Sequence, residues 1–159
     1  NLRKGVRIGL IEDKRWLRCD IKSISLLPNV LDKQSGFEQG FFEVWQVRNN
    51  LITEGTTSNA FIVKDERIFT LPKNNFILGG VTRDCVVKIA KENKIDIQEK
   101  AFSSNKIYTI DEAFLTSTTL GIIPVIQIND FIINKKKVGK ITKQLINKFN
   151  MFIDGQSST

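Results

Sequence analysis

Alternating apolar and polar positions predict β-strands along much of the chain. The clearest run is Phe-Glu-Val-Trp-Gln-Val-Arg at 42–48, which the turn pair Asn49-Asn50 separates from a second strand at 51–53. Asp65-Glu66 is predicted to close another hairpin. The remaining predicted strands are 5–11, 16–21, 59–64, 67–71, 95–102, 113–115 and 124–128, with a possible edge strand in the polar segment 132–138.

Three segments carry apolar residues at helical spacing. The segment 25–39 tolerates Pro28 in its first turn, and Leu27, Val30, Leu31 and Gln34 fall near helical spacing. The other two are 82–93, after a glycine pair, and 141–153. Residues 154–159 are predicted to be a disordered tail. Without a repeat or a linker, the pattern predicts one mixed α+β domain over residues 1–153, with mostly antiparallel strands.

Composition excludes several classes of function. The 159 residues fit one ordinary domain, and the net charge of +7 invites a nucleic-acid interpretation. The lysines are dispersed and do not alternate with aromatic residues, so we expect no nucleic-acid partner. The chain has no histidine, which removes Ser/His and Cys/His nucleophile pairs and most zinc sites. Cys19 and Cys85 are isolated, so we expect reduced thiols and no metal.

No run of residues approaches the ~20 apolar positions of a membrane span. We therefore expect no membrane association. No signal peptide is visible either, and together with the two unpaired thiols this predicts a cytoplasmic location.

Three features could together hold one ligand. Lys22 lies between the apolar residues of 16–21 and 24–27, where a lysine can become a nucleophile. Glu54 precedes a run of hydroxyl residues, and Gly79-Gly80 precedes the helix that begins near Thr82, a favourable place for a phosphate. Each feature has an ordinary alternative: a surface lysine, a turn carboxylate, a glycine pair before a helix. Their co-occurrence suggests pyridoxal phosphate.

The same residues resemble a known family, the fold-type IV pyridoxal-phosphate enzymes. The family's spaced motif is matched by Glu54, Thr56, Asn59, Ala60, Phe61, Thr70, Leu78, Gly80, Val81 and Arg83. The similarity covers about residues 6–149. Within the family, the segments around Lys22 and at 114–119 look most like the D-amino-acid aminotransferase group. Branched-chain aminotransferases usually carry a tyrosine five residues after the lysine, where this chain has Leu27.

The resemblance implies a role for each matching residue. Lys22 would form the Schiff base with pyridoxal phosphate and then move a proton between the substrate and the cofactor. Glu54 would pair with the pyridine nitrogen, and Leu78 would pack against the ring. Arg15 would lie near the cofactor. The residues implied to contact the phosphate, the ring or the substrate are Val81, Thr82, Ser117, Thr118, Thr57 and Ser58.

The chain also departs from the family. It matches only the C-terminal, cofactor-bearing domain, so we expect the N-terminal domain to come from the same chain or from another chain. The implied partners are an amino acid, a 2-oxo acid and a second copy in a homodimer. The implied reaction is transamination between D-alanine and 2-oxoglutarate. The alternatives left open are an aminodeoxychorismate lyase, a branched-chain aminotransferase, and a truncated, non-catalytic remnant.

Overall fold

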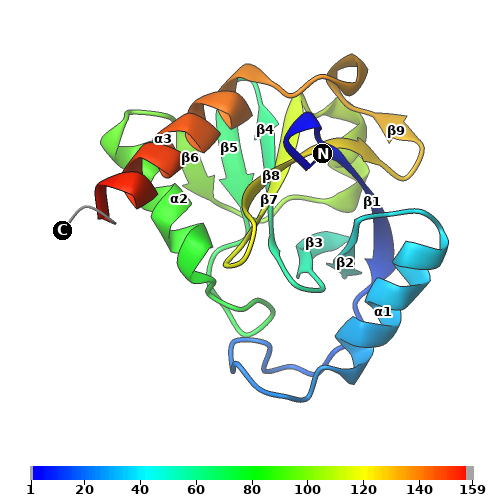
Figure 1. Ribbon diagram of the computed structural model, residues 1–159. Helices are drawn as coiled ribbons and strands as arrows, with labels where there is room; N and C mark the ends of the chain where they lie inside the picture. The colour runs from blue at the N-terminus through cyan, green and yellow to red at the C-terminus, as the bar shows by residue number, and fades with distance from the viewer. Residues whose placement is uncertain (1, 157–159) are drawn as a thin grey trace.

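The computed structural model describes residues 2–156, which form one nine-stranded sheet with helices around it (Figure 1). The strand order is β3-β2-β1-β8-β7-β4-β5-β6, and β9 pairs with β8. Five of the eight strand pairs among the described residues are antiparallel, and β1–β2, β1–β8 and β5–β6 are parallel. The prediction of a mostly antiparallel α+β fold is confirmed. The strands are β1 (Val6–Glu12), β2 (Glu43–Arg48), β3 (Leu51–Gly55), β4 (Asn59–Lys64), β5 (Arg67–Thr70), β6 (Ile97–Glu99), β7 (Glu112–Ser117), β8 (Gly121–Ile128) and β9 (Phe131–Ile132).

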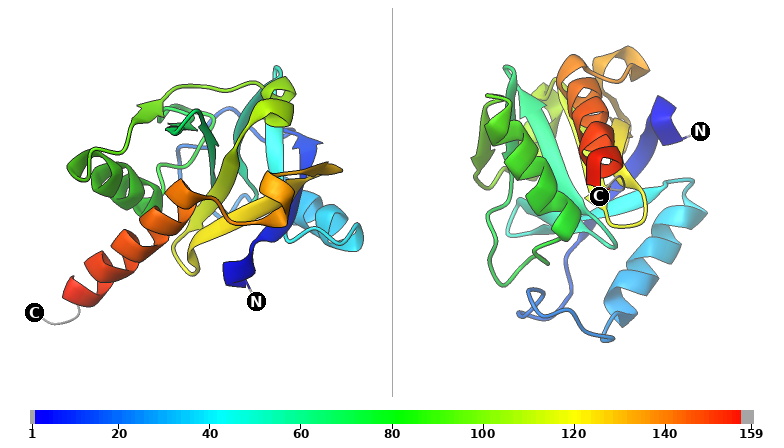
Figure 2. Two further views of the ribbon diagram at one scale, coloured as in Figure 1. Left: turned by 90° about the horizontal axis from the view of Figure 1, so that it is seen from above. Right: turned by 60° about the vertical axis from the view of Figure 1, so that its left-hand side comes forward.

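The α-helices lie on two sides of this sheet. Helices α2 (Val81–Glu92) and α3 (Lys140–Gln156) run side by side over one face, whereas α1 (Leu27–Glu38) packs beside β1 and β2 (Figures 1 and 2). Short 3-10 helices occupy Leu2–Lys4, Ser104–Thr109 and Asn134–Lys136. Helix α3 runs to Gln156, into the stretch predicted as a tail, and 157–159 lie outside the described residues.

The alternation of side chains along the central strands creates two hydrophobic cores. In β4, Ala60 and Ile62 belong to the core on one face, and Phe61 and Val63 to the core beneath α2 and α3. Phe61 stacks on Phe114 of β7 with ring centroids 4.7 Å apart. Burial on both faces explains why these strands are apolar at almost every position.

Two predicted hairpin turns are confirmed by their backbone angles. Asn49 and Asn50 have φ of 50° and 63°, and Asp65 and Glu66 have φ of 50° and 59°. Left-handed angles at both central residues match the twist of the flanking strands, and asparagine and aspartate tolerate this region better than most residues. The first of these hairpins ends at Gly55, directly before the hydroxyl run.

The prediction of an extended strand at 16–21 is wrong. This segment forms turns and bends within the loop that joins β1 to α1. Both edges of β1 are already paired, with β2 and with β8, so the sheet offers the loop no edge beside the strand that it follows. The predicted strand 95–102 is also shorter and reduces to β6.

Helix α1 forms as predicted, but its apolar stripe does not enter a core. Leu27, Val30 and Leu31 are 68%, 58% and 61% exposed, whereas Asp32 and Gly36 are buried. Val44 of β2 fills the space beside Gly36, where a Cβ would lie 2.4 Å from a valine methyl. The helix therefore packs on the sheet through a small residue and leaves its apolar side exposed in this chain.

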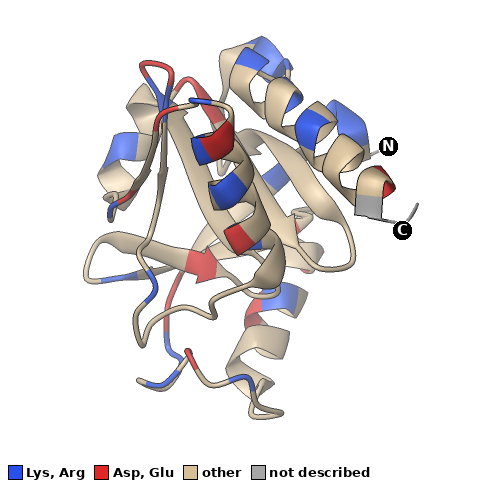
Figure 3. Cartoon of the chain, turned by 90° about the vertical axis from the view of Figure 1, so that its left-hand side faces the viewer, with Lys and Arg blue, Asp and Glu red and all other residues tan. Residues whose placement is uncertain are grey.

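Charged residues are mixed over the helical face of the molecule. Figure 3 shows Lys and Arg on α2 and α3, with Asp and Glu among those of α2. Among residues 2–156, no helix combines the length and the apolar character that a bilayer crossing requires.

Candidate active site

A single cavity of about 260 Å³ brings together nine of the ten predicted site residues. Its walls come from the β1–α1 loop, the end of β3 and the turn after it, the β5–α2 loop, the start of α2 and the β7–β8 turn. The nine are Arg15, Lys22, Glu54, Thr57, Ser58, Leu78, Thr82, Ser117 and Thr118. Val81 is the exception: it is not part of the cavity wall and is 71% exposed. Its predicted role concerned the backbone amide.

Lys22 lies on the cavity wall but in a more open environment than its sequence suggested. The residue is exposed, and neighbouring Ile21, Ile24 and Leu26 are 43%, 99% and 49% exposed. The apolar shell expected around this lysine is therefore not formed by the described chain. Any further covering of this loop has to come from outside the described chain.

Glu54 is held by three groups at the base of the cavity. Arg15 Nη1 donates to Oε1 at 2.6 Å, Asn59 Nδ2 donates to Oε2 at 3.0 Å, and the Leu78 amide donates to both oxygens at 3.1 Å. Burial raises the pKa of Glu54 to about 7, although the adjacent guanidinium of Arg15 works in the opposite direction. A positive group arriving in the cavity would favour the carboxylate form.

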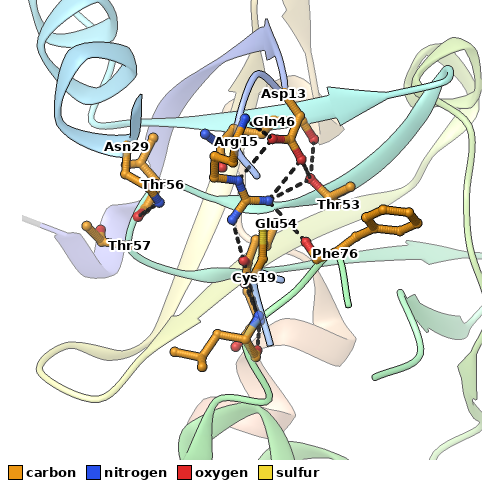
Figure 4. A network of polar contacts seen from close by, with 12 residues as sticks. Asp13, Arg15, Cys19, Asn29, Gln46, Thr53, Glu54, Thr56, Thr57 and Phe76 are labelled. Carbon is orange, nitrogen blue, oxygen red and sulfur yellow. Dashed lines mark hydrogen bonds and ion pairs between the residues drawn. The ribbon is translucent and has the colours of Figure 1, made fainter. Parts of the chain in front are cut away.

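Arg15 is clamped between two carboxylates (Figure 4). Besides Glu54 it contacts Asp13, to which Nε and Nη2 each donate at 3.0 Å. The side chains of Asp13, Arg15 and Glu54 are 0%, 5% and 7% exposed. Burial disfavours the charge on Arg15, but the two carboxylates outweigh it and raise the pKa of this guanidinium. The arginine is therefore a fixed positive charge beside Glu54.

Asp13 in turn is shared with a second arginine. Arg48 Nη2 at the end of β2 donates to Asp13 Oδ1 at 3.0 Å, and the Thr53 hydroxyl donates to Oδ2 at 3.1 Å. Burial would raise the pKa of Asp13, but hydrogen bonds and charge from Arg15 and Arg48 hold it below its usual value. The chain of alternating charges therefore runs from the end of β2 into the cavity.

The start of α2 offers free donors to an anion. Gly80 is the N-cap and provides no side-chain cap, and the amides of Val81 and Thr82 have no acceptor among the described residues. Gly80 is required here because a Cβ would lie 2.3 Å from Asn59 Oδ1. Asn59 thus contacts both groups: its Nδ2 donates to Glu54, and its Oδ1 lies against Gly80 at the start of α2. This end of the cavity suits a phosphate.

The hydroxyl run contacts the protein differently from what was expected. The Thr57 and Ser58 hydroxyls, predicted to point at a ring or a substrate, donate instead to Glu43 Oε2 at 2.8 and 3.1 Å. Both residues still line the cavity.

Sequence reasoning missed Asp13, Asn59 and Glu43 as parts of the site. Asn59 belongs to the spaced motif, and its amide could have been assigned to the neighbouring carboxylate. Asp13 has no such signal: it precedes Arg15 by two residues, but Arg18 and Asp20 show the same separation in an exposed pair. Spacing alone does not distinguish the buried ion pair from the exposed one.

Comparison with protein families decides where this chain belongs. Residues 2–128 match the family model described as amino-transferase class IV. The chain belongs to the class IV aminotransferases. Pyridoxal phosphate is the cofactor of this family.

Two curated relatives of this class IV aminotransferase chain are named D-alanine aminotransferase. The protein from Staphylococcus aureus (strain N315) is 42% identical over 157 residues, which cover 99% of this chain and 56% of the relative. The protein from Bacillus licheniformis is 42% identical over 141 residues, covering 89% of this chain and 50% of the relative. The chain thus spans about half the length of these relatives.

Solved structures of the same family share the fold. A putative branched-chain amino acid aminotransferase from Thermotoga maritima superposes with a TM-score of 0.88 at 27% identity, over 96% of this chain and 57% of that chain. The Escherichia coli branched-chain enzyme gives a TM-score of 0.80 at 28% identity, over 91% and 50%. The branched-chain aminotransferase from the archaeon Thermoproteus uzoniensis, solved with norvaline, gives 0.86 at 26%, over 96% and 52%.

Proposed function

We propose that the protein containing this chain is a pyridoxal-phosphate-dependent aminotransferase that transfers the amino group of a D-amino acid to a 2-oxo acid. D-alanine and 2-oxoglutarate are the favoured pair. One observation carries the proposal: a single cavity joins Lys22, the Arg15–Glu54 pair and Thr82 at the start of α2. The 42% identity to proteins named D-alanine aminotransferase supports the choice of substrate.

The residues of the cavity fit the cofactor by their chemistry. The unpaired amides of Val81 and Thr82, with the Thr82, Ser117 and Thr118 hydroxyls, would hold the phosphate. Glu54 would accept a hydrogen bond from the protonated ring nitrogen, and Leu78 would pack against the ring. Lys22 would provide the amine that reacts with the cofactor's aldehyde.

The chain's own residues then define the proton and charge transfers. When bound, the cofactor supplies an electron sink that stabilises negative charge at the substrate Cα. Lys22 would take the proton from that Cα and return a proton to the cofactor. Glu54 would keep the ring nitrogen protonated, and Arg15 would hold Glu54 in place through the 2.6 Å contact. Asp13 and Arg48 would fix Arg15 in turn.

An exposed apolar surface indicates where the N-terminal domain and a second copy of the chain would bind. The β1–α1 loop and the apolar side of α1 expose Leu17, Ile24, Leu27, Val30, Leu31 and Phe37. We propose that these side chains are covered in the whole protein by the N-terminal domain and by a second copy of the chain. That covering would also complete the apolar shell around Lys22.

The substrate assignment is tested by product analysis of the whole protein loaded with pyridoxal phosphate. With 2-oxoglutarate as acceptor, D-alanine should yield pyruvate at least a hundred times faster than L-leucine yields its 2-oxo acid. A preference for L-leucine would favour a branched-chain aminotransferase, which the superposed structures represent. Turnover of aminodeoxychorismate alone would favour the lyase.

A further inference from the structure

A second cavity lies toward the other end of β4 from the candidate active site. Its volume is about 240 Å³, and it shares no lining residue with the first cavity. Strand β4 begins at Asn59, on the wall of the first cavity, and ends at Lys64, on the wall of the second. At about 3.3 Å per residue, these two residues lie roughly 16 Å apart along the strand. The second cavity is therefore separate from the candidate active site.

One face of the sheet provides part of the lining. Ile62 of β4 pairs with Phe69 of β5, and Phe69 pairs with Gln98 of β6. Lys64 and Arg67 form the pair two positions along, and they point to the same face because side chains alternate along a strand. The chain after β6 provides the rest of the lining: Lys100, Ala101, Phe102, Lys106, Thr109 and Ile110.

The floor of this cavity is apolar and its rim is cationic. Ile62, Phe102 and Ile110 are 3%, 4% and 6% exposed and belong to a hydrophobic core, so they form the floor. Lys100 and Lys106 are exposed, so they stand at the rim. No aspartate or glutamate of residues 2–156 lines the cavity. Such a lining favours a ligand that has an apolar body and a negative charge.

The four cations of the lining differ in how their charge is compensated. Lys64 and Arg67 are paired with aspartates that do not line the cavity: Asp65, Asp96 and Asp111. The side chains of Lys100 and Lys106 make no ion pair or hydrogen bond with the part of the chain that the structure describes. Two positive charges therefore stand uncompensated beside an apolar floor.

We propose that this second cavity binds a small organic carboxylate whose apolar body is about the size of one ring, and that Lys100 and Lys106 bind its carboxylate. The apolar body would lie on Phe69 and Phe102. The cavity is smaller than the roughly 300 Å³ at which pockets for drug-sized ligands begin, which limits the ligand to this size. The inference does not depend on the proposed aminotransferase activity.

Lysine footprinting of the whole protein tests the site with 3-phenylpropanoate as the probe. The protein is acetylated at low conversion by an N-hydroxysuccinimide ester, and peptide mapping gives the rate at each lysine. The probe should slow acetylation of Lys100 and Lys106 in a saturable way, with a dissociation constant on the order of 1 mM, as expected for a ligand of this size. Exposed Lys137, which does not line the cavity, should react at an unchanged rate. Protection confined to Lys22, or none at Lys100 and Lys106, would overturn the proposal.

A neutral probe separates charge recognition from simple apolar binding. 3-Phenylpropanamide has nearly the same shape but no charge, so its dissociation constant at Lys100 and Lys106 should be at least about tenfold higher, because it loses the charged hydrogen bonds. If the amide protects these lysines as well as the carboxylate does, the proposal is wrong.

Substitutions at the rim test the two lysines separately. Lys100→Gln and Lys106→Gln each remove one exposed charge and keep a long polar side chain, so the fold should not change. In each variant the remaining lysine reports binding, and the dissociation constant of 3-phenylpropanoate should rise about three- to fivefold. Lys137→Gln is the matched control and should bind as the wild type does. If neither rim variant weakens binding more than Lys137→Gln does, the assignment to this cavity fails.

Discussion

Replacing Arg15 by methionine should destabilise the fold strongly, because it removes the cation between two buried carboxylates. Methionine fills much of the volume but leaves Asp13 and Glu54, 0% and 7% exposed, without the guanidinium. Removing one partner of a buried ion pair costs about 3–5 kcal/mol. Arg48 still contacts Asp13 at 3.0 Å, and Asn59 still donates to Glu54, so we expect about 3 kcal/mol near pH 8.5.

The loss should shrink as the pH falls. Burial raises the pKa of Glu54 to about 7 in the wild-type chain, above its value in the unfolded chain, so this group reduces the free energy of unfolding as pH rises from about 4.5 to 7. Without Arg15 the pKa of Glu54 should rise further, and the penalty should extend to higher pH. At pH 5.5 Glu54 is protonated in both proteins, so the difference should fall by about 1–2 kcal/mol. Asp13 keeps part of the penalty, because Arg15 lowers its pKa in the wild-type chain.

Urea unfolding at pH 5.5 and 8.5 measures this effect, followed by the fluorescence of the two tryptophans, fully buried Trp45 and half-exposed Trp16. Arg18→Met is the matched control. Arg18 belongs to the same loop and also pairs with a carboxylate two residues away, Asp20, but the two side chains are 58% and 37% exposed. Such a solvent-exposed pair contributes little to stability. If Arg15→Met costs no more than Arg18→Met, or costs the same at both pH values, the buried charge chain does not stabilise the fold as argued.

Three further substitutions test separate parts of the structure. Thr82→Val keeps the shape of the α2 start but removes a hydroxyl, so the dissociation constant of pyridoxal phosphate in an absorbance titration should rise about fivefold, by roughly 1 kcal/mol; a change under twofold would contradict the phosphate site. Glu112 accepts from two amides and a hydroxyl at the start of α3, so Glu112→Gln should lower the free energy of unfolding by about 1–2 kcal/mol without changing that titration. Gly55→Ala should destabilise the chain by about 1–3 kcal/mol, because the new Cβ would overlap Ser58 Oγ. A thermal unfolding temperature equal to or above that of the wild type would refute the packing of this turn.

Local pattern predicted the elements whose signals lie within a few residues. The hairpin at Asn49-Asn50 combines turn residues that tolerate positive φ with flanking alternation, and both determine the register locally. The parallel pairing of β1 with β8 could not be predicted in this way, because it joins residues more than a hundred positions apart. It is visible in the contact from the Leu10 amide to the Asn129 side chain. The prediction of a strand at 16–21 was wrong for the same reason: an apolar run needs an available sheet edge to become a strand.

The site shows a similar division. Lys22, Glu54 and Thr82 were predicted because the local pattern and the resemblance to the family both indicate them, and the fold brings them to one cavity. The residues that hold these groups were missed. Glu43 looked like an ordinary polar position in an alternating strand, and only the fold reveals that the turn 55–58 closes over it. Supporting contacts depend on which side chains meet, and single-sequence patterns do not specify that.

The central claim is that the amine of Lys22 reacts with a cofactor whose ring and phosphate occupy this cavity. The most direct measurement is borohydride reduction of the whole protein after incubation with pyridoxal phosphate, followed by peptide mapping. We predict a stable modification on Lys22 and its loss in Lys22→Ala, while the exposed lysines of α3 stay unmodified. Modification of a different lysine, or none despite cofactor binding, would contradict it.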